Sequence, residues 1–363
     1  MKAQYFLTMT ALVKKLLYIG LIICTCDLAI HAQAIYVDSN TGDDNNVGTE
    51  DAPVYSIHKA AEIIKSNSND IYCIKINPGI YVLDSFVSIE TDKDMTNKRI
   101  IIEAGILPDD RSWTPEQMPV IISTSKKGEI PGQDYHFVAA FLINESHVTI
   151  RGLKFPGYFY PNTRYFPIAR LNKATTDLFV EQCLFVGDED ASHLQVGIIA
   201  HGNEIVADHC VFYNVRNSVV FWQTAGGGIK TGNGITNSII FGATQSGVWT
   251  ADADRDFVFE NNIVSDCKYA WIKNSYNTTR YSIDNCIILN NEHYQAVAGD
   301  TVVPRAFEIE ENNVIKEGSI LLRPKDATTH YPLPIDYLNI MPNTLGHDMG
   351  AGLFKTRTNQ GRR

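Results

Sequence analysis

The sequence predicts an all-β protein, built as one parallel β-helix over residues 35–354. Two observations support this prediction. Short segments rich in Val, Ile and Phe recur through the second half of the chain at intervals of 24 to 30 residues, and no apolar stripe of helical period follows residue 70. A unit of this length can hold three short strands and three turns, which form one coil of a parallel β-helix.

Residues 1–34 have the pattern of a secretory signal peptide. Lys14 and Lys15 precede an apolar run over residues 16–26, and the small residues Ala32 and Ala34 follow. The run is far shorter than the ~20 residues that cross a bilayer, so we expect no transmembrane helix. The pattern predicts bacterial-type export to the periplasm or the extracellular space. A lipid anchor on Cys24 or Cys26 is the alternative.

Composition limits the class of protein. The 363 residues are 44% hydrophobic, enough for a large core, and the formal charge is -10. Without residues 1–34, 28 basic and 40 acidic residues remain, a charge of -12. This acidic balance argues against nucleic acid as a partner. The five remaining cysteines fit neither a disulfide framework nor a zinc site, and we expect them in the core; they are Cys73, Cys183, Cys210, Cys267 and Cys286.

The N-terminal part of the domain, residues 35–65, is expected to hold a first strand and a short helix. Ile57, Ala60, Ala61 and Ile64 form an apolar stripe at helical spacing within residues 56–65. The open end of a β-helix exposes core side chains, and an amphipathic helix can cover them. We therefore expect a capping helix here.

The repeats after residue 147 share one pattern, in which a strand runs into a polar pair, a small residue and an apolar pair. Their equivalent positions are expected to stack in a ladder inside the coils: Leu153, Cys183, Cys210, Ser238, Asn262, Cys286 and Asn313. A second strand follows each repeat, at 196–202, 219–224, 247–252, 269–274, 295–299 and 319–323. We expect the most regular coils over residues 147–323 and a flexible tail at 355–363.

Segments at both ends of the domain carry a resemblance to a known group. Residues 35–65, followed by IKINPGIYVLDSFVSI (74–89) and RIIIEA (99–104), resemble the start of secreted proteins of the pectin-lyase-like superfamily. GHDMGAGLF (346–354) is similar to their closing strand. The resemblance implies a right-handed, single-stranded parallel β-helix. It leaves the activity open, because the superfamily includes polysaccharide lyases, glycoside hydrolases, esterases and adhesive proteins.

Three tryptophans are candidates for binding a glycan. Trp222, Trp249 and Trp271 lie in the second strands of consecutive coils. Parallel strands in register place equivalent residues about 4.8 Å apart, so the indoles are expected to form an outward ladder. Packing of these residues beneath a loop is the alternative, since Trp is highly buried on average.

An aromatic segment at residues 155–167 is expected to project from the coils as a loop. Tyr158 and Tyr160 could contact sugar rings there, and Arg164 could pair with a uronate carboxylate. The alternative is that these aromatic residues fold back onto the coils as a small additional core.

Cationic residues flanking the tryptophans suggest acid–base chemistry on a uronate. A lyase needs a base to remove the C5 proton and a cation to neutralise the carboxylate. Lys273 or His201 is predicted as the base and Arg170 as the neutralising cation. The alternative for each of them is a solvated outer face.

Three alternating carboxylates, Asp252, Asp254 and Asp256, could face the same way on an extended segment and hold Ca²⁺. They could equally be the acid and base of a hydrolase, or a simple acidic turn. The neighbouring glycine-rich residues 226–234 are expected to form a wide turn at the same edge.

These observations favour a secreted carbohydrate-active protein with a polysaccharide as its partner. A lyase that cleaves an acidic polysaccharide is the first hypothesis. A glycoside hydrolase on the same fold, and a glycan-binding or structural protein without catalysis, are the alternatives. The excess of negative charge means that a local cation or bound Ca²⁺ would be needed to attract a polyanion.

Overall fold

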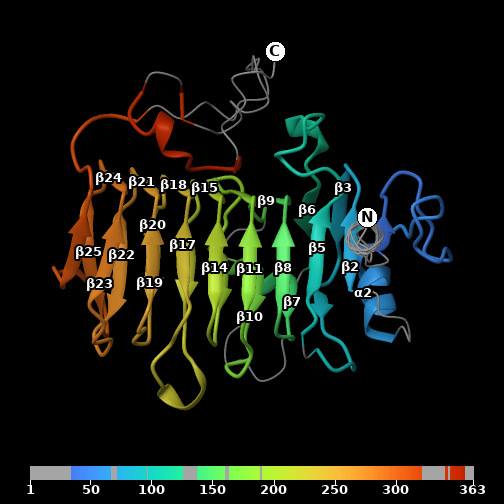
Figure 1. Ribbon diagram of the computed structural model, residues 1–363, viewed down its shortest axis with the longest axis horizontal. Coiled ribbons are helices and arrows are strands. Elements are labelled where there is room, and N and C mark those ends of the chain that lie inside the picture. The colour runs from blue at the N-terminus through green and yellow to red at the C-terminus, as the bar shows by residue number, and fades with distance from the viewer. Residues whose placement is uncertain are drawn as a thin grey trace, which may run out of the picture.

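The structure is a computed structural model that describes residues 34–66, 72–95, 97–125, 137–159, 163–188, 190–320, 340–341 and 344–355. Its strands stack side by side along the longest axis of the molecule (Figure 1). The expected signal peptide, with Cys24 and Cys26, lies outside the described residues but for Ala34. Of the expected tail at 355–363, only Lys355 is described.

Three long sheets form the walls of the coils. The 10-stranded sheet, here sheet A, has the order β1 (Ala34–Val37), β2 (Cys73–Ile76), β5 (Ile100–Ala104), β8 (Val148–Arg151), β11 (Leu178–Glu181), β14 (Ile205–Asp208), β17 (Gly234–Thr236), β20 (Val258–Glu260), β23 (Tyr281–Asp284) and β27 (Ile309–Asn312).

The 8-stranded sheet, sheet B, has the order β3 (Ile80–Leu83), β6 (Val120–Ser123), β9 (Lys154–Pro156), β12 (Leu184–Val186), β15 (Val211–Tyr213), β18 (Ile239–Phe241), β21 (Ile263–Ser265) and β24 (Ile287–Leu289). The 9-stranded sheet, sheet C, has the order β4 (Val87–Ile89), β7 (Val138–Ile143), β10 (Tyr165–Arg170), β13 (Val196–Ala200), β16 (Asn217–Phe221), β19 (Ser246–Thr250), β22 (Tyr269–Asn274), β25 (His293–Ala298) and β26 (Val302–Pro304).

The connectivity confirms the predicted parallel β-helix. In the regular coils the chain passes from sheet A to sheet B to sheet C, and then begins the next coil in sheet A. Every strand pairing among the described residues is parallel except that of β25 with β26, which is antiparallel. The expected last strand at 319–323 is not found, because residues 319 and 320 lie outside any strand and 321–323 are outside the described residues.

The predicted N-terminal helix is α2 (Ile57–Ser66), the one α-helix among the described residues. Its apolar stripe, the four residues named from the sequence, is buried. The helix contacts β1, β2 and β4, and β1 and β4 are end strands of sheets A and C (Figure 1). That α2 closes the open end of the core remains a prediction. No helix of the described ranges is long and apolar enough to cross a membrane.

The predicted interior ladder runs along the turn between sheets A and B, here called the A–B corner. Six of its seven members are buried within the coils, from Leu153 to Cys286. Polar members hydrogen-bond from coil to coil, since the Cys210 N–H donates to Ser238 Oγ at 3.0 Å and the Ser238 N–H to Asn262 Oδ1 at 2.9 Å. All five cysteines outside residues 1–34 are buried and unbridged, as expected of core residues.

The seventh member of the ladder was misplaced by one residue. Asn313 is exposed and stacks on Asn285, because β23 pairs with β27 in a register that places Asp284 opposite Asn312. Its φ of 52° belongs to the left-handed region, and Asn285 at 47° matches it. Asn adopts this conformation more readily than most side chains. Val314, and not Asn313, is therefore the equivalent of Cys286.

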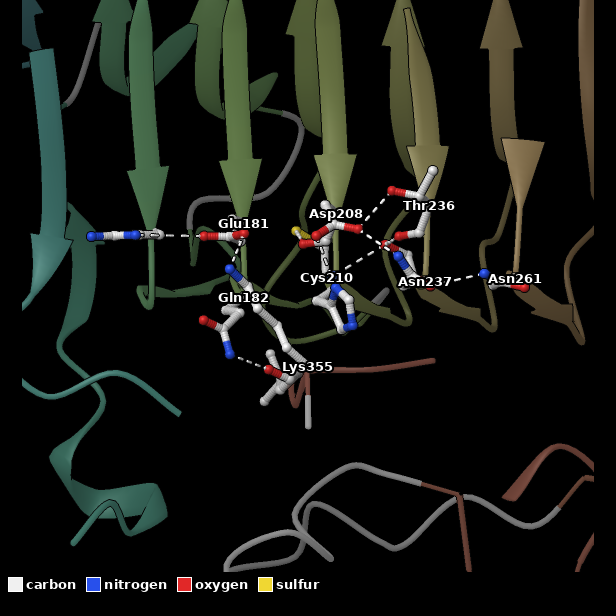
Figure 2. Close-up of polar contacts among 12 residues, drawn as sticks. Glu181, Gln182, Asp208, Cys210, Thr236, Asn237, Asn261 and Lys355 are labelled. Atoms are coloured by element: carbon white, nitrogen blue, oxygen red, sulfur yellow. Dashed lines mark hydrogen bonds and ion pairs between the residues drawn. The ribbon is translucent and has the colours of Figure 1, made fainter. Parts of the chain in front are cut away.

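Left-handed residues repeat at the A–B corner and form a second ladder on its outside (Figure 2). Asn237 donates to Asp208 Oδ1 at 2.8 Å, and Asn261 donates to Asn237 Oδ1 at 3.1 Å. Asn285 continues the series by donating to Asn261 Oδ1 at 2.6 Å. The coils from Asp208 to Asn285 are thus hydrogen-bonded to their neighbours at this corner through side chains as well as strands.

A C-terminal strap, residues 344–355, covers the outer face of sheet B. Leu353 and Phe354 join an apolar cluster with side chains of β12, β15, β18 and β21 (Figure 1). Phe354 packs edge-on against Trp113 with ring centroids 5.5 Å apart. Gln182 donates to the Leu353 carbonyl at 2.7 Å, and Lys355 pairs with Glu181 (Figure 2). The strap contains the short η4 (His347–Met349), and the loop before sheet B contains η1 (Pro115–Gln117).

Candidate functional site

The turns from sheet C to sheet A form a second corner, here the C–A corner, and it holds a cavity. These turns vary in length, and the longest of the regular coils lies between β16 and β17. The cavity, here the corner cavity, has a volume of about 720 Å³. Its lining comes from four of five consecutive turns, since the turn between β13 and β14 contributes no residue: Lys173, Gln223, Thr224, Gly226, Gly227, Gly228, Ile229, Asp252, Ala253, Tyr276 and Thr278.

Glycines shape the mouth of the corner cavity. Gly226 and Gly227 have φ angles of 69° and 64°, which lie in the left-handed region, within the short η2 (Ala225–Gly227). No atom lies within 4 Å of the position that a Cβ would take at either residue, so the turn faces open space. The wide turn expected at 226–234 is present at the predicted edge.

Three side chains give the corner cavity its chemistry. Lys173 is exposed, and its Nζ donates to Gln223 Oε1 at 2.8 Å. Asp252 accepts the Thr224 N–H at 2.9 Å through Oδ2. Tyr276 is 57% exposed. The cavity therefore presents a cation, a carboxylate and a phenol to a ligand.

Two of the predicted tryptophans form a surface that leads to the corner cavity. Trp222 and Trp249 are half-buried on the outer side of sheet C, and their rings meet edge-on with centroids 6.1 Å apart. Trp249 Nε1 donates to Asn274 Oδ1 at 2.8 Å, and Asn274 Nδ2 donates to the Tyr276 hydroxyl at 2.9 Å. The aromatic surface and the cavity are thus joined through Asn274.

The third tryptophan is a correction to the predicted ladder. Trp271 pairs with Val248, while Trp249 pairs with Ile272, so the two tryptophans are one register position apart. Successive residues of a strand point to opposite faces, and Trp271 therefore points into the coil. It is 2% exposed, and its Nε1 donates to Thr250 Oγ1 at 3.1 Å. Trp271 cannot contact a glycan in this structure.

Arg170 is also inside the coil and not on the expected outer face. It stands in register with Ala200, whose side chain belongs to the core. Its Nε donates to the His201 carbonyl at 2.8 Å, and its Nη2 to the Asn203 carbonyl at 2.7 Å. Burial lowers the pKa of Arg170 to about 9. Arg170 thus joins two coils and does not face a substrate carboxylate.

The two predicted bases are placed apart from the corner cavity's lining. His201 is buried, and burial together with nearby Lys230, Lys173 and Arg170 lowers its pKa to about 4. Lys273 is half-buried, with its Nζ 3.5 Å from the Thr279 carbonyl oxygen. Burial lowers the Lys273 pKa. His201 is therefore not on the expected outer face, and the role of Lys273 as a base stays a prediction.

Behind the corner cavity lies a group of buried charges, which we call the corner cluster: Arg170, His201, Lys230 and Asp254. Each has one buried polar atom without a hydrogen-bond partner in the described part of the chain, namely Arg170 Nη1, His201 Nδ1, Lys230 Nζ and Asp254 Oδ1. Burial lowers the pKa of Lys230 to about 7 and raises that of Asp254. Lys230, which follows the glycine turn, was not predicted as a site residue.

The structure does not bring the three predicted carboxylate ligands together. Asp252 accepts from Thr224, Asp254 accepts from Asn233 Nδ2 at 2.5 Å, and Asp256 accepts the Gly232 N–H at 2.9 Å. Each carboxylate thus holds a different part of the preceding turn. Within the ranges that the structure describes, no group of three or more His, Cys, Asp or Glu side chains could hold a metal ion. The predicted Ca²⁺ ligand set is therefore not formed.

The described residues at both ends of the aromatic segment, 155–158 and 165–167, pack on the coils, which was the alternative. Tyr158 is buried and its hydroxyl donates to the Ser125 carbonyl, so its predicted contact with a sugar is wrong. Tyr165 is buried within β10. Phe159 and Arg164 are exposed, and the Arg164 carbonyl accepts from the Val138 N–H of β7. Tyr160 lies outside the described residues.

The residues that line the corner cavity were mostly absent from the predicted site. Lys173 and Tyr276 lie in turns whose lengths differ from coil to coil, so no repeat marked them. Alignment of the turns on the strands that precede them would have placed 173, 223, 252 and 276 at one edge, two or three residues after equivalent strand positions. Asp252 is the predicted residue that the cavity does contain.

Several solved structures are similar to this chain, among them the following two. A rhamnogalacturonan lyase matches with a TM-score of 0.43 and 14% identity, over 77% of this chain and 73% of its own. A GH136 lacto-N-biosidase from Eubacterium ramulus, as the native protein, matches with a TM-score of 0.40 and 11% identity, over 78% of this chain and 55% of its own. No family model and no curated protein matches the chain. The likeness is one of fold.

Proposed function

We propose that the protein is a carbohydrate-active enzyme that binds an acidic polysaccharide at the corner cavity and cleaves it by β-elimination. The continuity from the Trp222–Trp249 pair through Asn274 to Tyr276 is the observation that carries this proposal. Exposed aromatic rings offer the apolar faces on which sugar rings pack, and a cavity with few, well-placed polar groups fixes orientation.

Lys173 supports the choice of an acidic substrate. It is exposed at the cavity, and its Nζ bonds to a neutral partner, Gln223. An ammonium placed in this way can donate to a uronate carboxylate, and such a charge-assisted bond is stronger than a neutral one. This local cation would offset the unfavourable field of a chain with a formal charge of -10.

Elimination suits the cavity better than hydrolysis. A glycosidase uses two carboxyl groups about 5 to 9.5 Å apart. Asp252 is the one carboxylate among the described residues that line the cavity, and it already accepts from the Thr224 N–H. The cavity's other proton-transfer groups are Lys173 and Tyr276, which suit a base and a neutralising cation.

In the proposed reaction the Tyr276 oxygen, as the phenolate, removes the C5 proton while Lys173 neutralises the carboxylate. The electrons of the C5–H bond are held on C5 and the carboxylate, and they form the double bond between C4 and C5 as the bond from C4 to the bridging oxygen breaks. That oxygen takes the electrons of the broken bond and is protonated by the tyrosine hydroxyl or by water. The products are a shortened chain and an unsaturated uronate, so atoms and electrons balance without a redox partner.

The direct test is incubation of purified protein with a panel of uronate polysaccharides, read by the ultraviolet absorbance of the unsaturated product. Each assay is run with Ca²⁺ and with a chelator, since Ca²⁺ dependence remains an expectation from the sequence. We expect absorbance to rise with at least one polymer. Binding without product on every polymer would overturn the enzyme proposal in favour of a glycan-binding protein. Reducing ends without absorbance would indicate a hydrolase.

Two variants test the assigned roles. Tyr276→Phe should lower kcat by about 100-fold or more with a small change in KM, because it removes only the hydroxyl. Lys173→Met should lower affinity by about 10-fold, the range of one lost charged hydrogen bond. Tyr55→Phe is the matched control, since Tyr55 is similarly exposed and lies before α2, away from the corner. Full activity in Tyr276→Phe would remove Tyr276 as the base.

We also propose that the protein acts outside the cytoplasm, on the basis of residues 1–34. Expression in a bacterial host, followed by fractionation and mass determination of the mature N-terminus, tests this. Cleavage near residue 34 is the expected result, and a lipidated N-terminal cysteine would indicate the anchored alternative.

A further inference from the structure

A second cavity lies where sheet B passes to sheet C, at the opposite end of the same sheet C strands. We propose that this cavity, here the B–C cavity, binds a second acidic group of the glycan, so that the substrate lies along β19 and β22 between the two cavities. This inference rests on the proposed function, because it names how far the same substrate extends.

The B–C cavity combines cations with an aromatic floor. It has a volume of about 360 Å³. Its lining comes from three successive coils and from β26: Arg216, Thr244, Gln245, Lys268, Tyr269 and Val302. Tyr269 lies against the imidazole of His293, with the rings stacked 5.3 Å apart. Lys268 Nζ lies 5.8 Å from the centre of the Tyr269 ring.

The two cations are arranged in one column along the coils. Gln245 donates its N–H to the Arg216 carbonyl, and Tyr269 donates its N–H to the Gln245 carbonyl, so Arg216 and Lys268 are two coils apart. Two strand spacings are roughly 10 Å. Arg216 Nε donates to Gln245 Oε1 at 2.9 Å, which turns the guanidinium toward the gap between the cations. A carboxylate-bearing sugar between them would meet a donor on either side.

Both cations are exposed and, among the described residues, neither forms an ion pair with a carboxylate. Glu292 stands next to Lys268 in register, because Tyr269 pairs with His293, yet the two side chains do not pair. Unpaired cations around a cavity of a strongly acidic chain create a local positive field, which attracts an anionic ligand.

The strands set the distance between the two cavities. Tyr269 begins β22 and Asn274 ends it, and Asn274 holds the Tyr276 hydroxyl of the corner cavity. Five residue steps along a strand span roughly 17 Å. Trp249 pairs with Ile272 between the two ends and presents its half-buried ring on the outer face. A ligand that touches both cavities must therefore be an oligosaccharide, with a middle sugar on Trp249.

The experiment measures binding of uronate oligosaccharides by calorimetry, with a disaccharide and an octasaccharide of a polymer that the protein binds. Five proteins are compared: the wild type, Arg216→Met/Lys268→Met, Lys173→Met, Glu292→Gln and the control Lys65→Met/Arg111→Met. The control removes the same charge from exposed residues away from both cavities, Lys65 of α2 and Arg111 of the loop between β5 and β6. Glu292→Gln removes the negative charge next to Lys268.

We expect Arg216→Met/Lys268→Met to weaken octasaccharide binding by about 10-fold or more and to leave disaccharide binding unchanged, because the shorter ligand occupies one cavity. Glu292→Gln should strengthen octasaccharide binding, and the control should match the wild type.

The outcomes separate this inference from the proposed function. Unchanged octasaccharide binding in Arg216→Met/Lys268→Met, with a loss in Lys173→Met, would overturn the second cavity and leave the proposed function intact. Unchanged binding of both ligands in Lys173→Met would overturn the proposed function. Weakening of both ligands by Arg216→Met/Lys268→Met would show that the B–C cavity binds alone, which would overturn the bridging arrangement.

Discussion

The A–B corner and the C–A corner both turn the chain from one sheet to the next. They differ in the length of their turns and in how their buried polar groups are hydrogen-bonded. At the A–B corner most coils use a turn of two residues, one of them left-handed, and side chains such as Asn237 and Asn261 bond from coil to coil. At the C–A corner the turns differ in length, and Lys230 and Asp254 have buried polar atoms without partners in the described residues.

The difference between the two corners shows where the fold tolerates a loss of stability for the sake of function. Uniform, hydrogen-bonded turns repeat because every coil gains the same contacts, as in other stacked repeats. Buried polar atoms without partners are costly and rare in folded proteins. Several such atoms lie together behind the corner cavity. The stacking of coils does not account for the charged residues at the C–A corner, and a chemical function there would.

The largest change in stability is expected from a substitution at the A–B corner. Asn262→Ala should lower the free energy of unfolding by about 2–4 kcal/mol, because Asn262 is fully buried and holds two backbone groups. Its Oδ1 accepts from the Ser238 N–H at 2.9 Å, and its Nδ2 donates to the Ile235 carbonyl at 2.6 Å. Denaturant unfolding followed by circular dichroism measures the change.

Asn313→Ala is the matched control for this prediction. Asn313 ends the outer ladder, is exposed, and makes one side-chain bond, to Asn285. Its replacement should change stability by less than about 1 kcal/mol. Equal losses in the two variants would show that stacking, and not burial of the polar ladder, controls stability at this corner.

Lys230→Met should raise the free energy of unfolding at neutral pH, whereas Asn262→Ala lowers it. The folded-state pKa of Lys230 is about 7, against 10.5 for the exposed side chain. Between these values the unfolded wild type binds more protons, so its stability should rise as pH increases from 7 toward 10.5. The variant lacks this rise. At pH 7 its free energy of unfolding should exceed that of the wild type by about 1 kcal/mol, and this difference should shrink with increasing pH.

The measurement is denaturant unfolding of both proteins at several pH values. Loss of the favourable charge of Lys230 near Asp254 works against the variant, so Lys230→Met/Asp254→Asn is the second variant. A wild type whose stability, relative to both variants, does not change with pH would contradict a buried, nearly neutral Lys230.

Much of the fold followed from the sequence, because it depends on short-range periodicity. The spacing of Leu153, Cys183 and Cys210 marks the coils, and the stripe from Ile57 to Ile64 marks α2. These patterns arise because each coil must bury the same face against its neighbour. The strap could not be predicted in this way, since its contacts with sheet B join residues far apart in the chain.

The candidate site was harder to predict, because it depends on register and on turns without repeats. Trp249 and Trp271 differ by one register position, which alone decides between the outer surface and the core. The alternation pattern near Trp271 fits either register. Arg170 was misplaced for the same reason, at the last position of a strand whose end the sequence does not mark.

His201→Leu should change the thermal stability of the protein by a smaller amount, which depends on pH. The pKa of His201 is about 4 in the folded protein, against 6.5 when exposed. Below 6.5 the unfolded wild type therefore binds more protons, and its stability should fall as pH decreases toward 4. The variant should melt within about 2 °C of the wild type at pH 7 and about 3 °C or more above it at pH 5. Parallel melting temperatures from pH 7 to 5 would contradict this.

The smallest effect is expected where the strap meets the A–B corner. Lys355 pairs with the buried carboxylate of Glu181, but the Lys355 side chain is partly exposed, and Arg151 also lies near Glu181, with Nη1 at 3.8 Å. Lys355→Met should thus cost about 1 kcal/mol or less, and added salt should reduce the difference. Phe354 and Leu353 would still hold the strap through burial on sheet B.

Protease digestion followed by mass spectrometry tests the attachment of the strap, because a strap held mainly by the ion pair would be cut rapidly in the Lys355→Met variant. Resistance equal to that of the wild type would place its attachment in the apolar contacts.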